Sequence, residues 1–128
     1  MSSEADNIVS AIIAKWCAGF AMLDAAALSS LYSKNAFFFG SNPKLYRGRD
    51  GVADYFNGLP RWRKPSATFS EVYAAQAGPD LINMGATITF DLAGERPDLV
   101  VKMSWVITRE DGEWKIVNHH ASSKAPLI

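Results

Sequence analysis

The sequence predicts an α+β domain in which a cone-shaped, curved antiparallel (mixed) sheet wraps around an N-terminal helix. Three observations predict it: helical periodicity comes first, alternating apolar and polar residues follow, and an Asp-Gly pair joins the last two alternating segments. Helices followed by hairpin-linked strands are typical of α+β proteins rather than of parallel doubly wound ones. Strands with one apolar face curl over helices and bury that face. We expect about three helices and four to six strands.

The bulk properties fit a single domain spanning residues 1–128. Hydrophobic residues make up 48% and charged residues 20%, which is typical of a globular protein. Thirteen basic residues balance thirteen acidic ones, so nucleic acid is not an expected partner. No apolar run is long enough to cross a membrane, and the acidic N-terminus does not resemble a signal peptide, which predicts a cytoplasmic location. The single cysteine, Cys17, excludes an internal disulfide.

Three segments have the features of helices. Ser3 and Asp6 form a capping-box pattern before an apolar stripe with a period of about four residues, which consists of Ile8, Ile12, Trp16 and Phe20. Asp24 can cap a second helix, whose buried face is formed by Leu28, Leu31 and Tyr32. Asp50 can cap a third helix, which carries Val52, Tyr55 and Phe56 and ends at Gly58.

The strands are predicted from their period of two. The expected segments are residues 37–40, 67–75, 81–92, 99–109 and 113–123. In the third of them the apolar face consists of Met84, Ala86, Ile88, Phe90 and Leu92, and in the fourth of Val101, Met103, Trp105 and Ile107. Asp111-Gly112 is a strong signal for a hairpin turn between the last two strands.

Three motifs resemble those of the nuclear-transport-factor-2-like superfamily, which includes SnoaL-like cyclases, ketosteroid isomerases and the association domain of calcium/calmodulin-dependent kinase II. They are Asp24-x-x-x-Leu28-x-x-Leu31-Tyr32, then Tyr46-Arg47-Gly48-Arg49-Asp50-Gly51-Val52, and the closing segment from Asp111 to Ser123. The resemblance implies a bent sheet around the first helix, a pocket between sheet and helices, and a homodimer formed through the outer face of the sheet. Because this fold carries many functions, the resemblance predicts architecture better than activity.

The resemblance also implies which residues face the pocket. The segment Thr87 to Gly94 resembles an isomerase strand that turns Ile88, Phe90 and Leu92 inward. The same alignment turns Met103 and Trp105 inward, followed by Ile116, Asn118, His120 and Ser122, with His119 on the outer face. These inward orientations hold or fail together, because side chains alternate along a strand and a shift of one residue would turn His119 inward in place of His120. The expected pocket residues are Trp16, Phe20, Tyr55, Ile88, Phe90, Met103, Trp105, Ile116, Asn118 and His120.

The isomerase chemistry itself is not expected. That reaction needs a carboxylate base and two acidic donors for an enolate oxygen. In the alignment Gly40 stands at the position of the base, and Trp16 and Trp105 stand at the positions of the donors. All three functional positions are therefore replaced.

His120 is the candidate catalytic residue. An imidazole in a partly apolar pocket can act as acid or base near neutral pH, but it can also only line the pocket through hydrogen bonds to its neighbours. His119 and His120 point oppositely on a strand and cannot bind one metal together. Cys17 is expected to be a small buried residue, and the basic segment Arg61 to Lys64 is either a solvated loop or a guide for an anionic ligand.

Two functions remain open at this point. The first is a small-molecule binding protein or SnoaL-like enzyme that takes a small apolar or cyclic ligand and, if it is an enzyme, uses acid/base chemistry. The second is a non-enzymatic assembly module like the kinase association domain, although Trp105 stands where that domain carries an inward arginine. No phosphate-binding glycine loop and no metal-binding spacing is present, so neither cofactor nor metal is expected.

Overall fold

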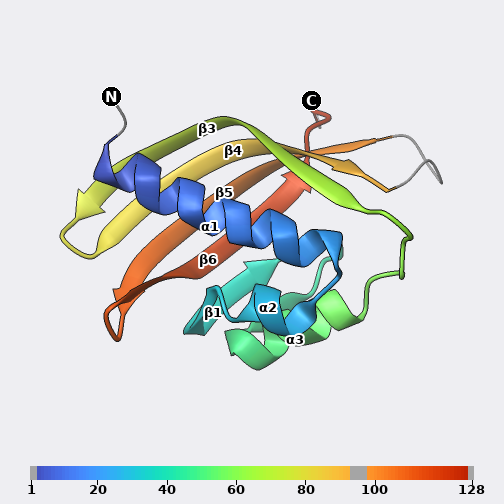
Figure 1. Cartoon of the computed structure of the whole chain (residues 1–128), viewed down its shortest axis with the longest axis horizontal. Helices are drawn as coiled ribbons and strands as arrows, with labels where there is room; N and C mark the ends of the chain where they lie inside the picture. Colours follow the sequence, from blue (N-terminus) through green and yellow to red (C-terminus); the bar gives the residue numbers. More distant parts are fainter. Residues whose placement is uncertain (1–2, 93–97, 127–128) are drawn as a thin grey trace.

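The computed structural model describes residues 3–92 and 98–126 as a bent six-stranded sheet with helices on its concave side (Figure 1). The sheet has the order β2-β1-β6-β5-β4-β3, and only the β1–β6 pair is parallel. The elements are α1 (Glu4–Ala21), α2 (Ala25–Ser29), β1 (Tyr32–Phe39), β2 (Leu45–Arg47), α3 (Gly48–Asn57), β3 (Ser66–Gly78), β4 (Leu81–Asp91), β5 (Leu99–Glu110) and β6 (Glu113–Ser123). The predicted fold class is confirmed: these residues contain three helices and six strands in a mixed sheet.

The starts of the first two helices follow the predicted capping chemistry. The backbone N–H of Asp6 donates to Oγ of Ser3 at 3.1 Å, and the Asp6 carboxylate accepts from the backbone N–H of Ser3. Oδ1 of Asp24 accepts from the backbone N–H of Ala27 at 3.0 Å, which starts α2. These bonds satisfy N–H groups that have no partner within a helix.

Several boundaries differ from the prediction, and β2 lies in none of the predicted strand segments. Tyr32 begins β1 rather than ending the second helix, because its neighbour Leu31 accepts a backbone hydrogen bond from Ile116 and Tyr32 pairs with Ile116 in β6. The third helix starts at Gly48, and Asp50 lies in its first turn instead of capping it. Gly48 has φ +70°, which a residue with a side chain adopts only with strain. The predicted motif Thr87 to Gly94 ends at positions 93 and 94, which lie outside the described residues.

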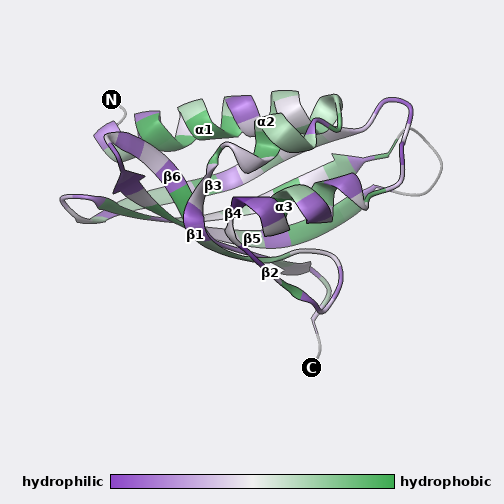
Figure 2. Ribbon diagram, turned by 90° about the horizontal axis from the view of Figure 1, so that it is seen from below, coloured by the Kyte–Doolittle hydropathy of each residue, from purple (hydrophilic) through white to green (hydrophobic). Residues whose placement is uncertain are grey.

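The core lies between α1 and the concave face of the sheet. Figure 2 shows α1 in a layer on one side of the strands. The alternation predicted for β4 and β5 is confirmed, since these strands bury Ile82, Met84, Ile88, Val101, Met103, Trp105 and Ile107. The predicted Asp-Gly hairpin is present as well, with positive φ angles at Asp111 (53°) and Gly112 (81°). Two positive φ angles are the signature of the tight turn whose twist suits a hairpin.

The parity of β6 changes at Val117. The strand pairs Ile116 with Ile107 of β5 but Asn118 with Val106, so Val117 is an extra residue, a β-bulge. A bulge reverses the side-chain alternation for every residue that follows it. His119 therefore points inward and is 2% exposed, while His120 is exposed. The predicted orientations of the two histidines are wrong, and this bulge is the reason.

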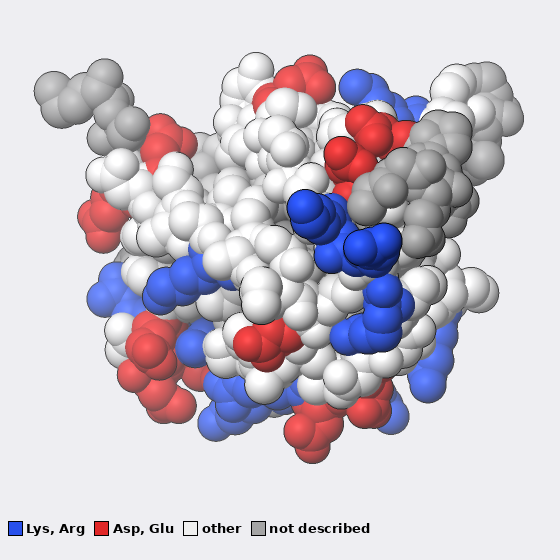
Figure 3. Space-filling model, turned by 45° about the vertical axis from the view of Figure 1, so that its right-hand side comes forward, with Lys and Arg blue, Asp and Glu red and all other residues white. Residues whose placement is uncertain are grey.

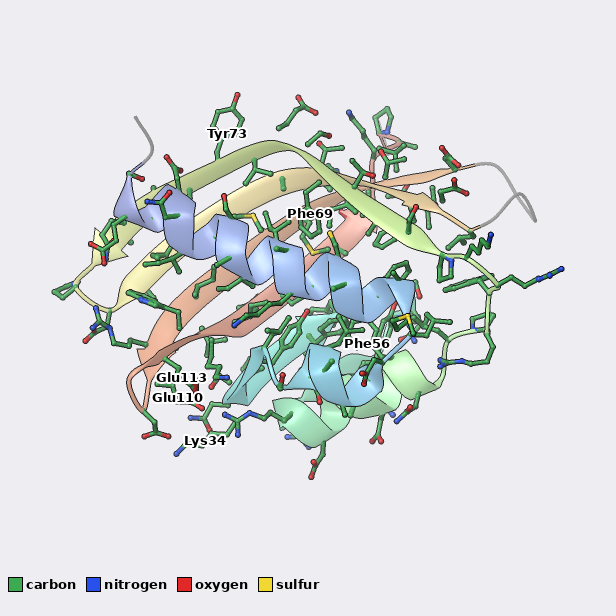
Figure 4. The ribbon with its side chains drawn as sticks, viewed as in Figure 1. Lys34, Phe56, Phe69, Tyr73, Glu110 and Glu113 are labelled. Carbon is green, nitrogen blue, oxygen red and sulfur yellow. The ribbon has the colours of Figure 1, made fainter. Side chains whose placement is uncertain are left out.

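A polar cluster fixes the lower end of the sheet, where Figure 4 shows Glu110 beside Lys34. Nη2 of Arg49 lies 2.7 Å from Oε1 of Glu110, and Nε of Arg49 donates to the backbone carbonyl of Tyr32 at 2.9 Å. The other Glu110 oxygen accepts from Oγ of Ser33. The Ser33 hydroxyl is the main group that lowers the pKa of Glu110, with contributions from the Lys34 N–H and from Arg49. The cluster joins α3, β1 and β5.

We expect Glu110→Gln to flatten the acid side of the stability profile. A carboxyl group with a lowered pKa stabilises the fold above its unfolded pKa, and this contribution is lost as pH falls through the folded pKa. The wild type should therefore lose unfolding free energy more steeply than the variant below the ordinary value of 4.5. Urea unfolding at a series of acid pH values measures this. Glu113→Gln, at a side chain that is 70% exposed, is the control and should keep the wild-type slope.

Candidate functional site

A cavity of about 260 Å³ opens between the concave side of the sheet and the helices α1 and α3. Apolar and aromatic side chains form most of its wall. The lining residues are Trp16, Phe20, Phe38, Gly40, Ser41, Tyr55, Phe56, Leu59, Trp62, Phe90, Leu92, Leu99, Val101, Met103, His119, Ala121, Ser122 and Ser123. Concave, largely apolar sites with a few polar groups are typical of small-molecule binding.

Aromatic rings from α1, α3, β4 and the segment after α3 build one side of the cavity. Trp16 stacks on Phe20 with ring centroids 5.5 Å apart, and Phe90 lies 5.1 Å from Phe20. Trp62, from the segment after α3, lies 6.3 Å from Phe20. Phe56 meets Trp16 edge-on at 6.0 Å, and Figure 4 places Phe56 between α3 and α1. Such faces suit a flat, apolar molecule.

Tyr55 forms the wall beside the end of β1. Its hydroxyl donates to Oγ of Ser41 at 2.9 Å and accepts from the Ser41 backbone N–H at 3.0 Å. Gly40 leaves the space that the Tyr55 ring occupies, because a Cβ at Gly40 would lie 2.5 Å from Cζ of Tyr55. The position that a base would take in the isomerase alignment is therefore filled by a tyrosine ring.

A chain of buried hydrogen bonds ends at His119. Nε1 of Trp16 donates to the hydroxyl of Tyr32 at 3.0 Å, and this hydroxyl lies 2.8 Å from Nδ1 of His119. Nε1 of Trp105 donates to the same Nδ1 at 3.0 Å. Phe38 stacks on the imidazole, with ring centroids 3.9 Å apart and an angle of 21° between the planes. The imidazole is thus held on one face and at one nitrogen.

Burial keeps the two titratable groups of this hydrogen-bonded cluster, His119 and Tyr32, uncharged. It lowers the pKa of His119 to about 3, with a smaller contribution from the neighbouring His120. Burial also raises the pKa of Tyr32 far above its ordinary value. Both groups are neutral at physiological pH, because the charged form of each would lose its hydration. The imidazole of His119 that lines the cavity is therefore neutral.

Half of the predicted pocket residues line the cavity. These five are Trp16, Phe20, Tyr55, Phe90 and Met103. Three others, Ile88, Trp105 and Ile116, are fully buried in the core instead, and Trp105 approaches the site through its bond to His119. Asn118 and His120 lie exposed on the outer side of β6, so their predicted inward orientation is corrected, and with it the geometric basis for catalysis by His120.

The sequence reasoning missed several lining residues. His119 and Ala121 were missed because of the bulge, which nothing in the local sequence marks. Phe38 could have been identified as the inward member of the Phe37-Phe38-Phe39 run. In the basic segment from Arg61 to Lys64, Trp62 lines the cavity. Arg61 does not; it donates hydrogen bonds to the backbone carbonyls of Phe56, Leu59 and Leu23.

Among the described residues, neither charged side chains nor metal-binding clusters line the cavity. None of its described lining residues is a lysine, arginine, aspartate or glutamate. Residues 3–92 and 98–126 hold no group of three His, Cys, Asp or Glu side chains placed to bind a metal. None of the helices in these ranges has the length and hydropathy of a membrane-spanning segment. Acidic and basic side chains are interspersed on the face shown in Figure 3.

Comparison with known proteins identifies the family. One similar structure is a candidate calcium/calmodulin-dependent protein kinase II association domain from Xanthomonas campestris. Its sequence is 23% identical, its TM-score is 0.84, and the match covers 99% of this chain and 91% of that one. An NTF2-like protein of unknown function from Pseudomonas putida has 14% identity and a TM-score of 0.84, covering 99% and 92%. A candidate scytalone dehydratase from Novosphingobium aromaticivorans has 16% identity and a TM-score of 0.79, covering 93% and 83%.

At these identities the solved structures show a shared fold only. No curated protein sequence matches that of this chain. The SnoaL-like domain family, however, matches residues 9–126, which is nearly the whole chain and runs from within α1 to beyond the end of β6. The chain therefore belongs to the SnoaL-like domain family, and it shares its fold with the NTF2-like protein from Pseudomonas putida.

Proposed function

We propose that this protein binds a small, largely apolar, cyclic molecule in the cavity. The observation that carries the proposal is the composition of the wall: aromatic rings of Trp16, Phe20, Trp62 and Phe90 on one side, and one buried imidazole, His119, on another. Burying a flat ring against such faces is favourable, and one polar group suffices to orient it. A cavity of about 260 Å³ suits a molecule of one or two rings.

The described residues support binding better than proton transfer. A general base at the cavity would need a group able to accept a proton near neutral pH. His119 is held neutral with its pKa near 3, and no described lining residue is a carboxylate. The Tyr55 hydroxyl is already engaged with Ser41. The expected acid/base role of His120 has no support, because its side chain is exposed outside the cavity.

Filling the cavity tests the proposal. Ala121 lines the cavity next to Met103, and its neighbour His120 points the other way. Ala121→Phe is expected to weaken binding of an uncharged two-ring probe by about tenfold or more, because the added ring would occupy space in the cavity that the probe needs. His120→Phe, which adds the same ring outside the cavity, should bind like the wild type. Isothermal titration calorimetry measures both, and thermal unfolding confirms that both variants fold.

The alternative function is assembly without a ligand. The outer face carries exposed apolar side chains, among them Phe37 (50% exposed) and Tyr73 (75% exposed), and Figure 4 shows Tyr73 pointing away from α1. The likeness to a candidate kinase association domain also favours it. The homodimer through this face stays a prediction. Failure of the wild type itself to bind any probe in the same titrations would favour assembly over ligand binding.

A further inference from the structure

The proton of His119 has one possible place. An indole N–H can only donate, so Nδ1 of His119, which accepts from Nε1 of Trp105, carries no proton. The Tyr32 hydroxyl accepts from Nε1 of Trp16 and therefore gives its own proton to the same Nδ1. A neutral imidazole keeps one proton, and it must sit on Nε2. Trp105 and Tyr32 act as positioning residues that fix this tautomer.

The Nε2–H group reaches the cavity. Nε2 of His119 has no hydrogen-bond partner among the described residues. No described side-chain nitrogen or oxygen is both sealed from solvent and without a partner, so Nε2 must contact open space. His119 is 2% exposed, and the open space that it touches is the cavity. A buried donor that has no described protein partner and borders an apolar cavity is a group that a ligand can satisfy.

We propose that the ligand is an uncharged ring compound that carries a carbonyl-type acceptor, placed against Nε2–H of His119. This inference rests on the proposed binding function and specifies the chemical class of its ligand. A hydrocarbon of the same shape leaves the N–H unsatisfied, which disfavours its binding. A carboxylate would lose its hydration without meeting a cation, because no lysine or arginine is among the described lining residues.

Three matched probes test the ligand class. They are α-tetralone, tetralin and a tetralin carboxylate, which share two fused rings and differ in the polar group. The wild type is expected to bind the ketone about tenfold more tightly than the hydrocarbon and than the carboxylate, as measured by calorimetry. Equal binding of ketone and hydrocarbon would overturn the ligand class and leave the proposed function standing. Absence of binding by all three would overturn both.

A variant and a spectroscopic measurement make the test specific to His119. His119→Asn supplies an amide oxygen for Trp105 and Tyr32 but is too short to place a donor at the cavity. It should lose the preference for the ketone over tetralin, to within about twofold, because the donor at the cavity is gone. In the wild type, ¹⁵N NMR should show Nε2 protonated and Nδ1 bare from about pH 5 to 8. A proton on Nδ1 would overturn the inference, even if the variant fails to fold.

Discussion

Replacing Trp16 with alanine is expected to lower the free energy of unfolding by about 3–5 kcal/mol, the range seen when a large buried aromatic side chain is removed. Trp16 is 2% exposed and contacts rings from α1, α3, β3 and β4. Its loss would enlarge the cavity at the point where α1 meets the sheet. It would also leave the Tyr32 hydroxyl without the donor that orients it toward His119.

Denaturant unfolding followed by circular dichroism measures the effect. Trp114→Ala is the matched control, because Trp114 is only partly buried near the start of β6, where Arg109 lies 4.9 Å from its ring. We expect this control to lose much less stability than Trp16→Ala. Equal losses in the two variants would show that Trp16 is not the central packing element of the helix–sheet interface.

The fold could be predicted because its signals are local and redundant. The capping box at Ser3, the cap at Asp24 and the Asp111-Gly112 turn each depend on a few adjacent residues, and all appear as expected. The alternation in β4 and β5 is long enough that no single residue decides it. Tyr32 was misassigned because a helix end and a strand start can share one apolar residue, and only its pairing with Ile116 decides between them.

The candidate site could be predicted only in part, because it depends on one irregularity. Half of the expected lining residues come from α1, α3 and the regular part of the sheet, where periodicity holds. In β6 a single extra residue, Val117, exchanges His120 for His119. A bulge is decided by how two strands pair over their whole length, and it leaves no mark in a short segment. The histidine that lines the cavity, His119, is thus one position away from the predicted one.

Gly40→Ala is expected to lower the free energy of unfolding by about 1–3 kcal/mol, the usual effect of overpacking. The new Cβ would lie 2.5–2.6 Å from three atoms of the Tyr55 ring and hydroxyl. That ring cannot move aside freely, since its hydroxyl bonds Ser41 and its centroid lies 4.7 Å from the centroid of the Phe38 ring. Because Gly40 and Tyr55 both line the cavity, probe binding should weaken as well.

A double-mutant cycle identifies the cause. In a Tyr55→Leu background the same Gly40→Ala substitution should cost less than about 0.5 kcal/mol, which gives a coupling energy above about 1 kcal/mol. Gly85→Ala is the control, since no atom lies within 4 Å of its added Cβ. Gly85 lies within β4, so alanine there should leave stability unchanged or raise it. An undiminished cost in the Tyr55→Leu background would place the strain elsewhere.

This coupling also explains why isomerase chemistry is absent from the expected function. Gly40 occupies the position of the catalytic base in the isomerase alignment, and the space that a base would need is filled by Tyr55. A carboxylate introduced there would meet the same ring atoms as alanine, and it would be buried without a described cation to pair with. The packing of Tyr55 against Gly40 therefore leaves no room for a base at this position, which agrees with the proposed binding of a neutral ring.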